Sequence, residues 1–122
     1  MTLDMIDRAF ADSFAKEWIE GWNRRDIEAV MLHYDDDFEM SSPYIVQVTG
    51  EPSGTLKGKE SVRAYWTKAL AGYPNLHFEL IETLVGVGSI VLYYKGVGGR
   101  AVAEVFHFNT QGKVVRSYAN YS

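Results

Sequence analysis

The sequence predicts an α+β domain in which helices come first and an antiparallel sheet follows. Apolar residues at helical spacing dominate the first half of the chain, and short segments of strand character separated by turn signals fill the second. Because the two kinds of structure are segregated along the chain, we expect the helices to cover one face of the sheet. The length of 122 residues, without an internal repeat or a linker, predicts one domain over residues 1–122.

Two helices joined by a tight turn are predicted at the N-terminus. Apolar residues recur every three or four positions from Leu3 to Trp22, which is the pattern of one face of a long amphipathic helix. Asp26 then has the character of an N-cap for a second helix, whose apolar face runs from Ile27 to Tyr34.

The middle of the chain mixes loop and helix signals. The acidic run 35–37 would be unfavourable beside a helix C-terminus, so we expect it in a solvated loop. Residues 38–48 are expected to be extended, with a break at Pro43, and residues 49–55 have the composition of a loop. A third helix is predicted between Gly58, just before it, and Gly72, after it, because apolar residues from Val62 to Leu70 again follow helical spacing.

Four strands are predicted between Leu76 and Tyr121. Turn signals separate them at residues 86–89, 96–99 and 109–112. Short and regular spacing of this kind is typical of an antiparallel meander.

Composition excludes several classes of function. Twelve basic and sixteen acidic residues give a net charge of −4, so phosphate backbones are repelled and we expect no nucleic-acid partner. No apolar run approaches the ~20 residues that cross a bilayer, and acids stand where a secretory leader would carry basic residues. We therefore expect a cytoplasmic protein without a membrane partner. The absence of cysteine removes disulfides and thiolate chemistry.

No metal and no cofactor are expected. His33, His77 and His107 are too dispersed to form a local ligand pair. The segment 86–88 lacks the third glycine of a dinucleotide fingerprint and precedes a strand instead of a helix. No serine lies in the nucleophile elbow of a hydrolase.

Four segments resemble a known family. They are Trp-Asn-Arg-Arg-Asp-Ile-Glu-Ala-Val at 22–30, Tyr-Asp-Asp-Asp-Phe at 34–38, Gly-Lys-Glu-Ser-Val-Arg-Ala-Tyr-Trp at 58–66, and Glu-Val-Phe-His-Phe-Asn-Thr-Gln-Gly-Lys-Val-Val at 104–115. Together they resemble the nuclear-transport-factor-2-like superfamily, in its SnoaL-like (polyketide-cyclase-like) and ketosteroid-isomerase-like branch. The resemblance implies a cone-shaped roll, in which a curved, mainly antiparallel sheet wraps around the three helices and encloses a deep apolar pocket, commonly in homodimers.

The superfamily includes isomerases, cyclases, dehydratases and proteins without chemistry, so function depends on the site residues. Placed on the ketosteroid isomerase pattern, the catalytic base falls on Ser42, the oxyanion-hole tyrosine on Trp18 and the oxyanion-hole acid on Glu104. A serine hydroxyl is too weak a base at neutral pH, and an indole donates a hydrogen bond but cannot exchange a phenolic proton. We therefore do not expect that mechanism of isomerisation.

Glu104 is the predicted catalytic residue. In a strand, side chains alternate, so Glu104 shares a face with the apolar residues Val102 and Phe106. Burial there would raise its pKa and favour the neutral carboxyl, which can donate a hydrogen bond or a proton. A second interpretation places Glu104 near the pocket mouth, or pairs it with Arg100 or Arg116, without a chemical role.

An excess of aromatic residues, 14% of the chain, predicts a lined pocket. Any one of these residues could equally belong to a closed core. The expected substrate-binding residues, which would hold a small apolar molecule with one or two oxygens, are Trp18, Tyr34, Met40, Ser42, Trp66, Phe106 and Tyr121.

Two functions remain open from the sequence. The first is a cofactor-free acid–base isomerase, cyclase or lyase, with Glu104 as the acid and with Ser42 and Tyr34 orienting the substrate. The second is a non-catalytic ligand-binding or dimerising accessory protein. A homodimer is expected in both cases, because the outer sheet face carries mixed apolar residues such as Val105, His107 and Tyr118.

Overall fold

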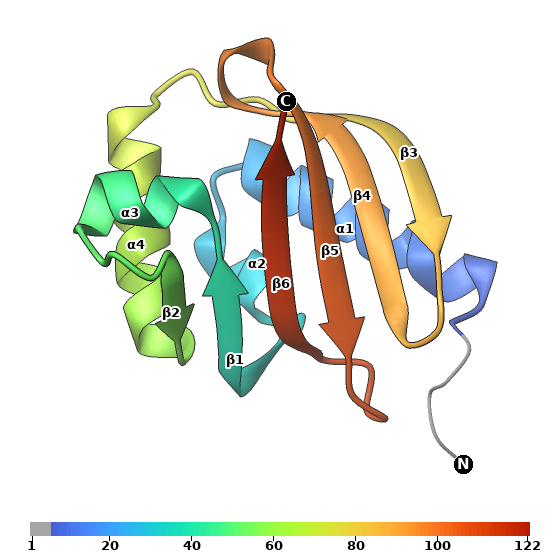
Figure 1. Ribbon diagram of the computed structural model, residues 1–122. Helices are drawn as coiled ribbons and strands as arrows, with labels where there is room; N and C mark the ends of the chain where they lie inside the picture. The colour runs from blue at the N-terminus through green and yellow to red at the C-terminus, as the bar shows by residue number, and fades with distance from the viewer. Residues whose placement is uncertain (1–5) are drawn as a thin grey trace.

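The computed structural model describes residues 6–122, so the predicted helix start at Leu3 lies outside the described residues. The fold is α+β, as predicted, with helices packed on one side of a curved six-stranded sheet (Figure 1). In chain order the elements are α1 (Arg8–Asn23), α2 (Ile27–Met31), β1 (Tyr34–Ser41), α3 (Pro43–Thr49), β2 (Thr55–Lys57), α4 (Lys59–Gly72), β3 (Glu79–Val85), β4 (Ser89–Lys95), the short 3₁₀ helix η1 (Val97–Gly99), β5 (Ala101–Phe108) and β6 (Val114–Tyr121).

The sheet is a meander extended by two earlier strands. Its order is β2-β1-β6-β5-β4-β3, and the four strands from β3 to β6 pair antiparallel with their neighbours in sequence, which confirms the predicted meander. Strand β1 adds to β6 in parallel, with Met40 opposite Ser117, and β2 pairs with β1 antiparallel. The sheet therefore brings β1, from the N-terminal half, beside the last strand of the chain.

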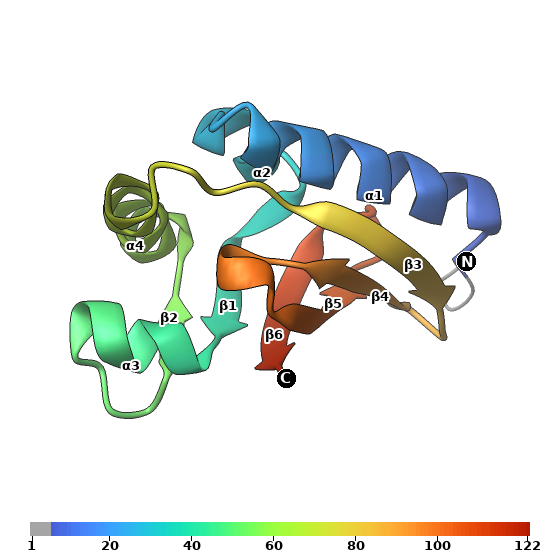
Figure 2. The same cartoon turned by 90° about the horizontal axis from the view of Figure 1, so that it is seen from above.

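Helix α1 lies along the inner face of the sheet, and no helix of residues 6–122 covers the opposite face of β4 and β5 (Figure 2). Asp7 caps this helix, because its side chain accepts a hydrogen bond of 2.7 Å from the backbone N–H of Phe10. Asp26 caps α2 in the same way through the N–H of Ala29, at 3.1 Å, as predicted. None of the helices in residues 6–122 is long and apolar enough to cross a membrane.

The predictions for residues 31–37 were wrong in two respects, because Tyr34 does not belong to the second helix and the acidic run does not lie in a loop. Helix α2 ends at Met31, and Tyr34 begins strand β1 instead of ending the helix. The acidic run 35–37 lies in this strand, where the pairing with β6 is irregular between Tyr34 and Glu39. The side chains of Asp36 and Asp37 are exposed there, so the strand keeps the acids solvated without a helix C-terminus beside them.

A further helix, α3, replaces part of the extended segment that was expected over residues 38–48. Ser42 caps it by accepting a hydrogen bond from the N–H of Tyr44 at 3.2 Å, and Pro43 occupies the first helical turn, where a missing N–H costs nothing. Gly50 ends the helix with a φ of 79°. The described residues therefore contain four α-helices, whereas three were expected.

The outer face of the sheet exposes large side chains. Tyr93 and Tyr118 are each 40% exposed and Leu84 is 49% exposed. His107 lies on this face, opposite to Glu104 along β5, and its ring meets the ring of Tyr118 edge-on at 5.9 Å between centroids.

Close contact between α1 and α2 depends on Gly21. A Cβ atom at this position would lie 2.8 Å from Cγ2 of Val30, a side chain with no exposed surface. We expect Gly21→Ala to lower the free energy of unfolding by about 1–3 kcal/mol, because a packed core resists an added methyl group. Urea denaturation measures this change, with Gly72→Ala as the matched control, since nothing lies within 4 Å of that position. Equal stability of the two variants would contradict the close contact.

Candidate functional site

A cavity of about 70 Å³ lies between the sheet and the helices. Room for one water molecule requires roughly 10–15 Å³ on this measure, so the cavity holds several waters or a compact organic molecule. The lining residues come from α1, β1, α3, α4, the segment before β3, β4, η1, β5 and β6, and they are Trp18, Trp22, Met40, Tyr44, Val48, Tyr65, Trp66, Ala69, Tyr73, Leu76, Phe78, Tyr94, Gly96, Val97, Val102, Glu104 and Tyr121. Most of them are aromatic or aliphatic, which is typical of a small-molecule site.

The lining has a buried end and a more open end. Trp18, Trp66 and Glu104 are buried, whereas Tyr44, Val97 and other lining residues remain partly exposed. The partly exposed residues come from α3, the end of α4, the segment that follows it, η1 and the end of β6. These elements therefore form the more open end of the cavity.

Glu104 points inward because side chains alternate between the two faces along a strand, and only 3% of its surface is exposed. On the neighbouring strand, the hydroxyl of Tyr94 donates a hydrogen bond of 2.8 Å to Oε1 of Glu104. Burial raises the pKa of Glu104 from 4.5 to about 7, while the hydrogen bond from Tyr94 opposes this shift. A substantial fraction of the carboxyl is therefore neutral near pH 7 and can donate a proton.

Neither arginine considered at the sequence level pairs with Glu104. Arg100 donates hydrogen bonds to the backbone oxygen of Ser122 and, at 3.2 Å, to the hydroxyl of Tyr44. Arg116 projects from the opposite face of the sheet and is exposed. No salt bridge involves Glu104 among residues 6–122, so burial is not offset by a cation.

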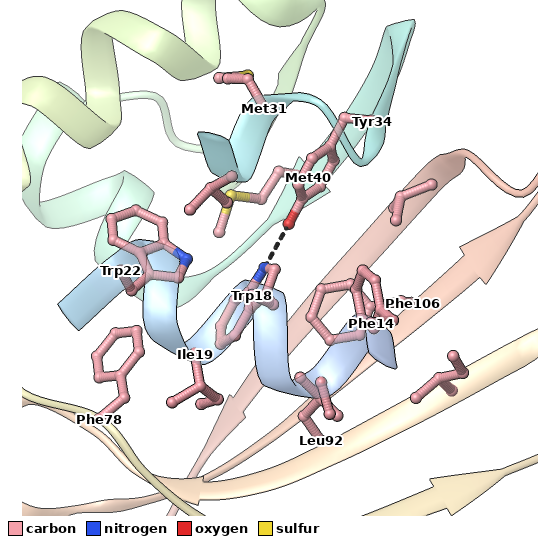
Figure 3. Packing of buried hydrophobic residues seen from close by; sticks show 14 of the residues in the cluster. Phe14, Trp18, Ile19, Trp22, Met31, Tyr34, Met40, Phe78, Leu92 and Phe106 are labelled. Carbon is pink, nitrogen blue, oxygen red and sulfur yellow. Dashed lines mark hydrogen bonds between the residues drawn. The ribbon is translucent and has the colours of Figure 1, made fainter. Parts of the chain in front are cut away.

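Trp18 is fixed by a buried hydrogen bond. Its indole N–H donates to the hydroxyl of Tyr34 at 2.9 Å, and Figure 3 shows the two side chains meeting from α1 and β1. Burial raises the pKa of Tyr34 well above its ordinary value, and the nearby charge of Glu104 adds to the effect. Tyr34 thus remains neutral and supports Trp18 from outside the cavity lining.

The predicted site residues separate into two groups. Five of them line the cavity, namely Glu104, Trp18, Met40, Trp66 and Tyr121. The other three lie outside the lining. Tyr34 supports Trp18, Ser42 caps α3 with its hydroxyl 3.5 Å from that of Tyr121, and Phe106 packs in the core against Phe14.

Sequence reasoning missed Trp22, Tyr65 and Tyr94. Trp22 follows Trp18 by one helical turn on the same face, so helical spacing was a sufficient signal for it. Tyr65 precedes Trp66 on α4 and lines the cavity as well. Tyr94 reaches Glu104 only through the register of β4 on β5, in which Leu92 stands opposite Glu104, and no local pattern reveals that register.

Two residues that line this cavity carry a buried donor without a partner. The indole N–H groups of Trp22 and Trp66 form no hydrogen bond with any of residues 6–122. A buried donor left without a partner costs about 1–3 kcal/mol, so a natural fold keeps few of them. The two rings meet edge-on with 4.9 Å between their centroids.

Metal-ligating side chains do not cluster in the part of the chain that the structure describes. The cavity presents one carboxyl group, several phenols and the indoles to a ligand. This set of groups can donate and accept hydrogen bonds and can transfer a proton at Glu104.

The chain belongs to the SnoaL-like family, because residues 15–117 match the model of the SnoaL-like domain. A SnoaL-like protein of unknown function from Burkholderia thailandensis is 53% identical, covers 97% of this chain and 98% of its own, and superposes with a TM-score of 0.93. No curated protein matches the chain in sequence.

More distant structures share the fold. A provisionally named ketosteroid isomerase from Kribbella flavida is 14% identical over 93% of this chain and 78% of its own, with a TM-score of 0.67. A provisionally named polyketide cyclase from Sinorhizobium meliloti is 12% identical over 88% of this chain and 94% of its own, with a TM-score of 0.72. At this level of identity the comparison establishes a common architecture and leaves activity open.

The buried carboxyl of Glu104 makes stability depend on pH. Its folded pKa of about 7 exceeds the ordinary 4.5, so the unfolded chain loses this proton first as pH rises. The free energy of unfolding should therefore fall between about pH 4.5 and pH 7, by roughly 3 kcal/mol in total, and the contribution of this group should be constant outside that window. Urea titrations at a series of pH values give the free energy of unfolding of wild type and of Glu104→Gln. The contribution of Glu104 is the difference between these two free energies. A difference independent of pH would contradict a raised pKa.

Proposed function

We propose that the protein binds a compact, mainly apolar molecule with a carbonyl oxygen in the cavity, and that Glu104 acts on it as a general acid. The observation that carries this proposal is the carboxyl group at the buried end of an aromatic cavity, hydrogen-bonded to Tyr94. A raised pKa in a buried, concave site is a marker of acid–base chemistry.

The chemistry follows from the protonation state of Glu104. Its neutral form donates a proton to the carbonyl oxygen while a water molecule or another base removes a proton from the adjacent carbon, which yields the enol. The resulting Glu104 carboxylate is stabilised by the hydrogen bond from Tyr94. For isomerisation, the enol then takes a proton at carbon from the protonated base and returns its O–H proton to Glu104. In cyclisation the enol carbon instead attacks an electrophilic carbon of the ligand, and in elimination the enol expels a leaving group from the next carbon.

A second candidate function is ligand binding without turnover. Among the described residues that line the cavity, Glu104 is the only Asp or Glu, and the position of the family's base is Ser42, which caps α3. The absence of a side-chain carboxylate base beside this acid, among the described residues, is the observation that supports the second candidate.

Exchange of carbon-bound hydrogen for deuterium distinguishes acid–base catalysis from binding without turnover, and it does not require the natural substrate to be known. In deuterated buffer, 2-tetralone exchanges the hydrogens next to its carbonyl through its enol, and NMR follows the loss of these signals. We expect the protein to accelerate the exchange, with a rate that falls as pH rises through about 7, the pKa of Glu104, because the proton-donating form is lost. Glu104→Gln should abolish the acceleration.

The matched control is Glu82→Gln, since Glu82 is exposed on β3 and should leave the rate unchanged. Acceleration that survives in Glu104→Gln would remove Glu104 from the mechanism. Binding of 2-tetralone without acceleration would favour the non-catalytic candidate, and absence of binding would argue against the ligand class.

We also propose that the protein is a homodimer formed through the outer sheet face. The side chains of Tyr93, Tyr118 and Leu84 leave apolar surface exposed there, and no helix in the described part of the chain covers β4 and β5 on that side (Figure 2). A two-fold axis would place this face against its copy and bury the tyrosines.

Sedimentation equilibrium at micromolar concentration tests the homodimer. Wild type should have twice the chain mass of 13.8 kDa, and Tyr118→Glu should have the mass of one chain, because it buries a charge in the interface. Ala71→Glu, on an exposed part of α4, should remain a dimer. A wild-type mass of one chain would contradict the proposal.

A further inference from the structure

Two of the three tryptophans that line the cavity carry an unused hydrogen-bond donor. Trp22 is 6% exposed and Trp66 is 2% exposed, both line the cavity, and their indole N–H groups have no partner within residues 6–122. Figure 3 shows the nitrogen of Trp22 on the side of its ring that faces Trp18 and Met40, which also line the cavity. Almost no surface of either indole nitrogen is accessible to solvent, so bulk water does not supply the missing acceptor.

Trp18 shows that an unused donor is not a general property of this cavity wall. Its indole N–H is satisfied by the hydroxyl of Tyr34 at 2.9 Å. It lies on the same helix as Trp22, and the two rings meet edge-on with 6.1 Å between their centroids. The fold therefore provides an internal acceptor for one indole, while the next indole and its neighbour Trp66 have none among residues 6–122.

The residues around the cavity define the chemistry of the acceptor. An indole N–H only donates, so the ligand atom must accept. No Lys, Arg or His belongs to the lining formed by the described residues, and the one carboxylic acid in it is Glu104. A ligand anion would be buried without a counter-charge, whereas a ketone, ester or ether oxygen accepts hydrogen bonds without that penalty.

We propose that Trp22 and Trp66 form a second polar subsite of the cavity, which binds an uncharged acceptor oxygen of the ligand. The inference rests on the proposed function, in which the first oxygen of the ligand is bound by Glu104. It narrows the ligand class to uncharged compact ring compounds that carry two acceptor oxygens, one at each end of an apolar body.

A matched pair of probes tests the second subsite on the wild-type protein. 2-Tetralone carries one carbonyl oxygen, and 6-methoxy-2-tetralone adds an ether oxygen at the opposite end of the same rigid bicycle. In the NMR spectrum of protein labelled with ¹⁵N at its indoles, we expect the resonances of Trp22 and Trp66 to move downfield with the methoxy compound only. The indole resonances are assigned by their loss in Trp22→Phe and in Trp66→Phe. The resonance of Trp18 should not move downfield with the methoxy compound.

Binding affinity provides the second measurement. The methoxy compound should bind wild type about five- to tenfold more tightly than 2-tetralone, which is the worth of a typical hydrogen bond. This ratio should fall toward one in Trp22→Phe and in Trp66→Phe. Trp18→Phe is the control, because it removes similar aromatic area but a donor that is already bonded within the protein, and it should keep the ratio.

The outcomes separate this inference from the proposed function. If both probes bind equally and the indole resonances do not move downfield, the second subsite is refuted while the proposed site at Glu104 stands. If 2-tetralone alone moves these resonances, its single oxygen binds at the tryptophans and the two-oxygen assignment fails. If neither probe binds, the proposed function and this inference fall together. Glu104→Gln should keep the affinity ratio, since it alters only the first oxygen's site.

Discussion

The burial of the Glu104 carboxyl among aromatic side chains is the constraint on which the site depends. Strand alternation directs this side chain inward, and the register of β4 on β5 brings the Tyr94 hydroxyl within 2.8 Å of it. No cation compensates the carboxyl within residues 6–122, so the apolar surroundings favour its neutral form. A group that is costly to ionise in the folded state is at the same time a proton donor near neutral pH, and the feature that lowers stability is the one that provides reactivity.

The scaffold holds the walls around this group through aromatic contacts and a few buried hydrogen bonds. Trp18 is fixed by Tyr34, and its ring contacts those of Trp22 and Tyr94 edge-on. These contacts link α1 to β1 and β4 and fix the rings that line the cavity. Rigid aromatic walls reduce the entropy lost when a ligand binds, and they leave the unpartnered indoles of Trp22 and Trp66 in defined positions.

Periodicity predicted the part of this structure that depends on local pattern. The α1 and α4 helices, the four-stranded meander and the inward direction of Glu104 follow from spacing alone, and the family resemblance adds the curvature of the sheet. Helix α3 was missed because a proline after an extended segment was interpreted as a break in a strand, whereas Ser42 and Pro43 begin a helix. The contacts of Tyr94 with Glu104 and of Trp18 with Tyr34 require long-range register and packing, which one sequence does not reveal.

The central claim is that Glu104 is a neutral acid under conditions in which an exposed glutamate is ionised. The most direct measurement is a pH titration of its side-chain carboxyl carbon by NMR in ¹³C-labelled protein, with the resonance assigned through Glu104→Gln. The structure predicts a midpoint of about 7. A midpoint near 4.5, the ordinary value for glutamate, would contradict the account and with it the role of Glu104 as the acid of the cavity.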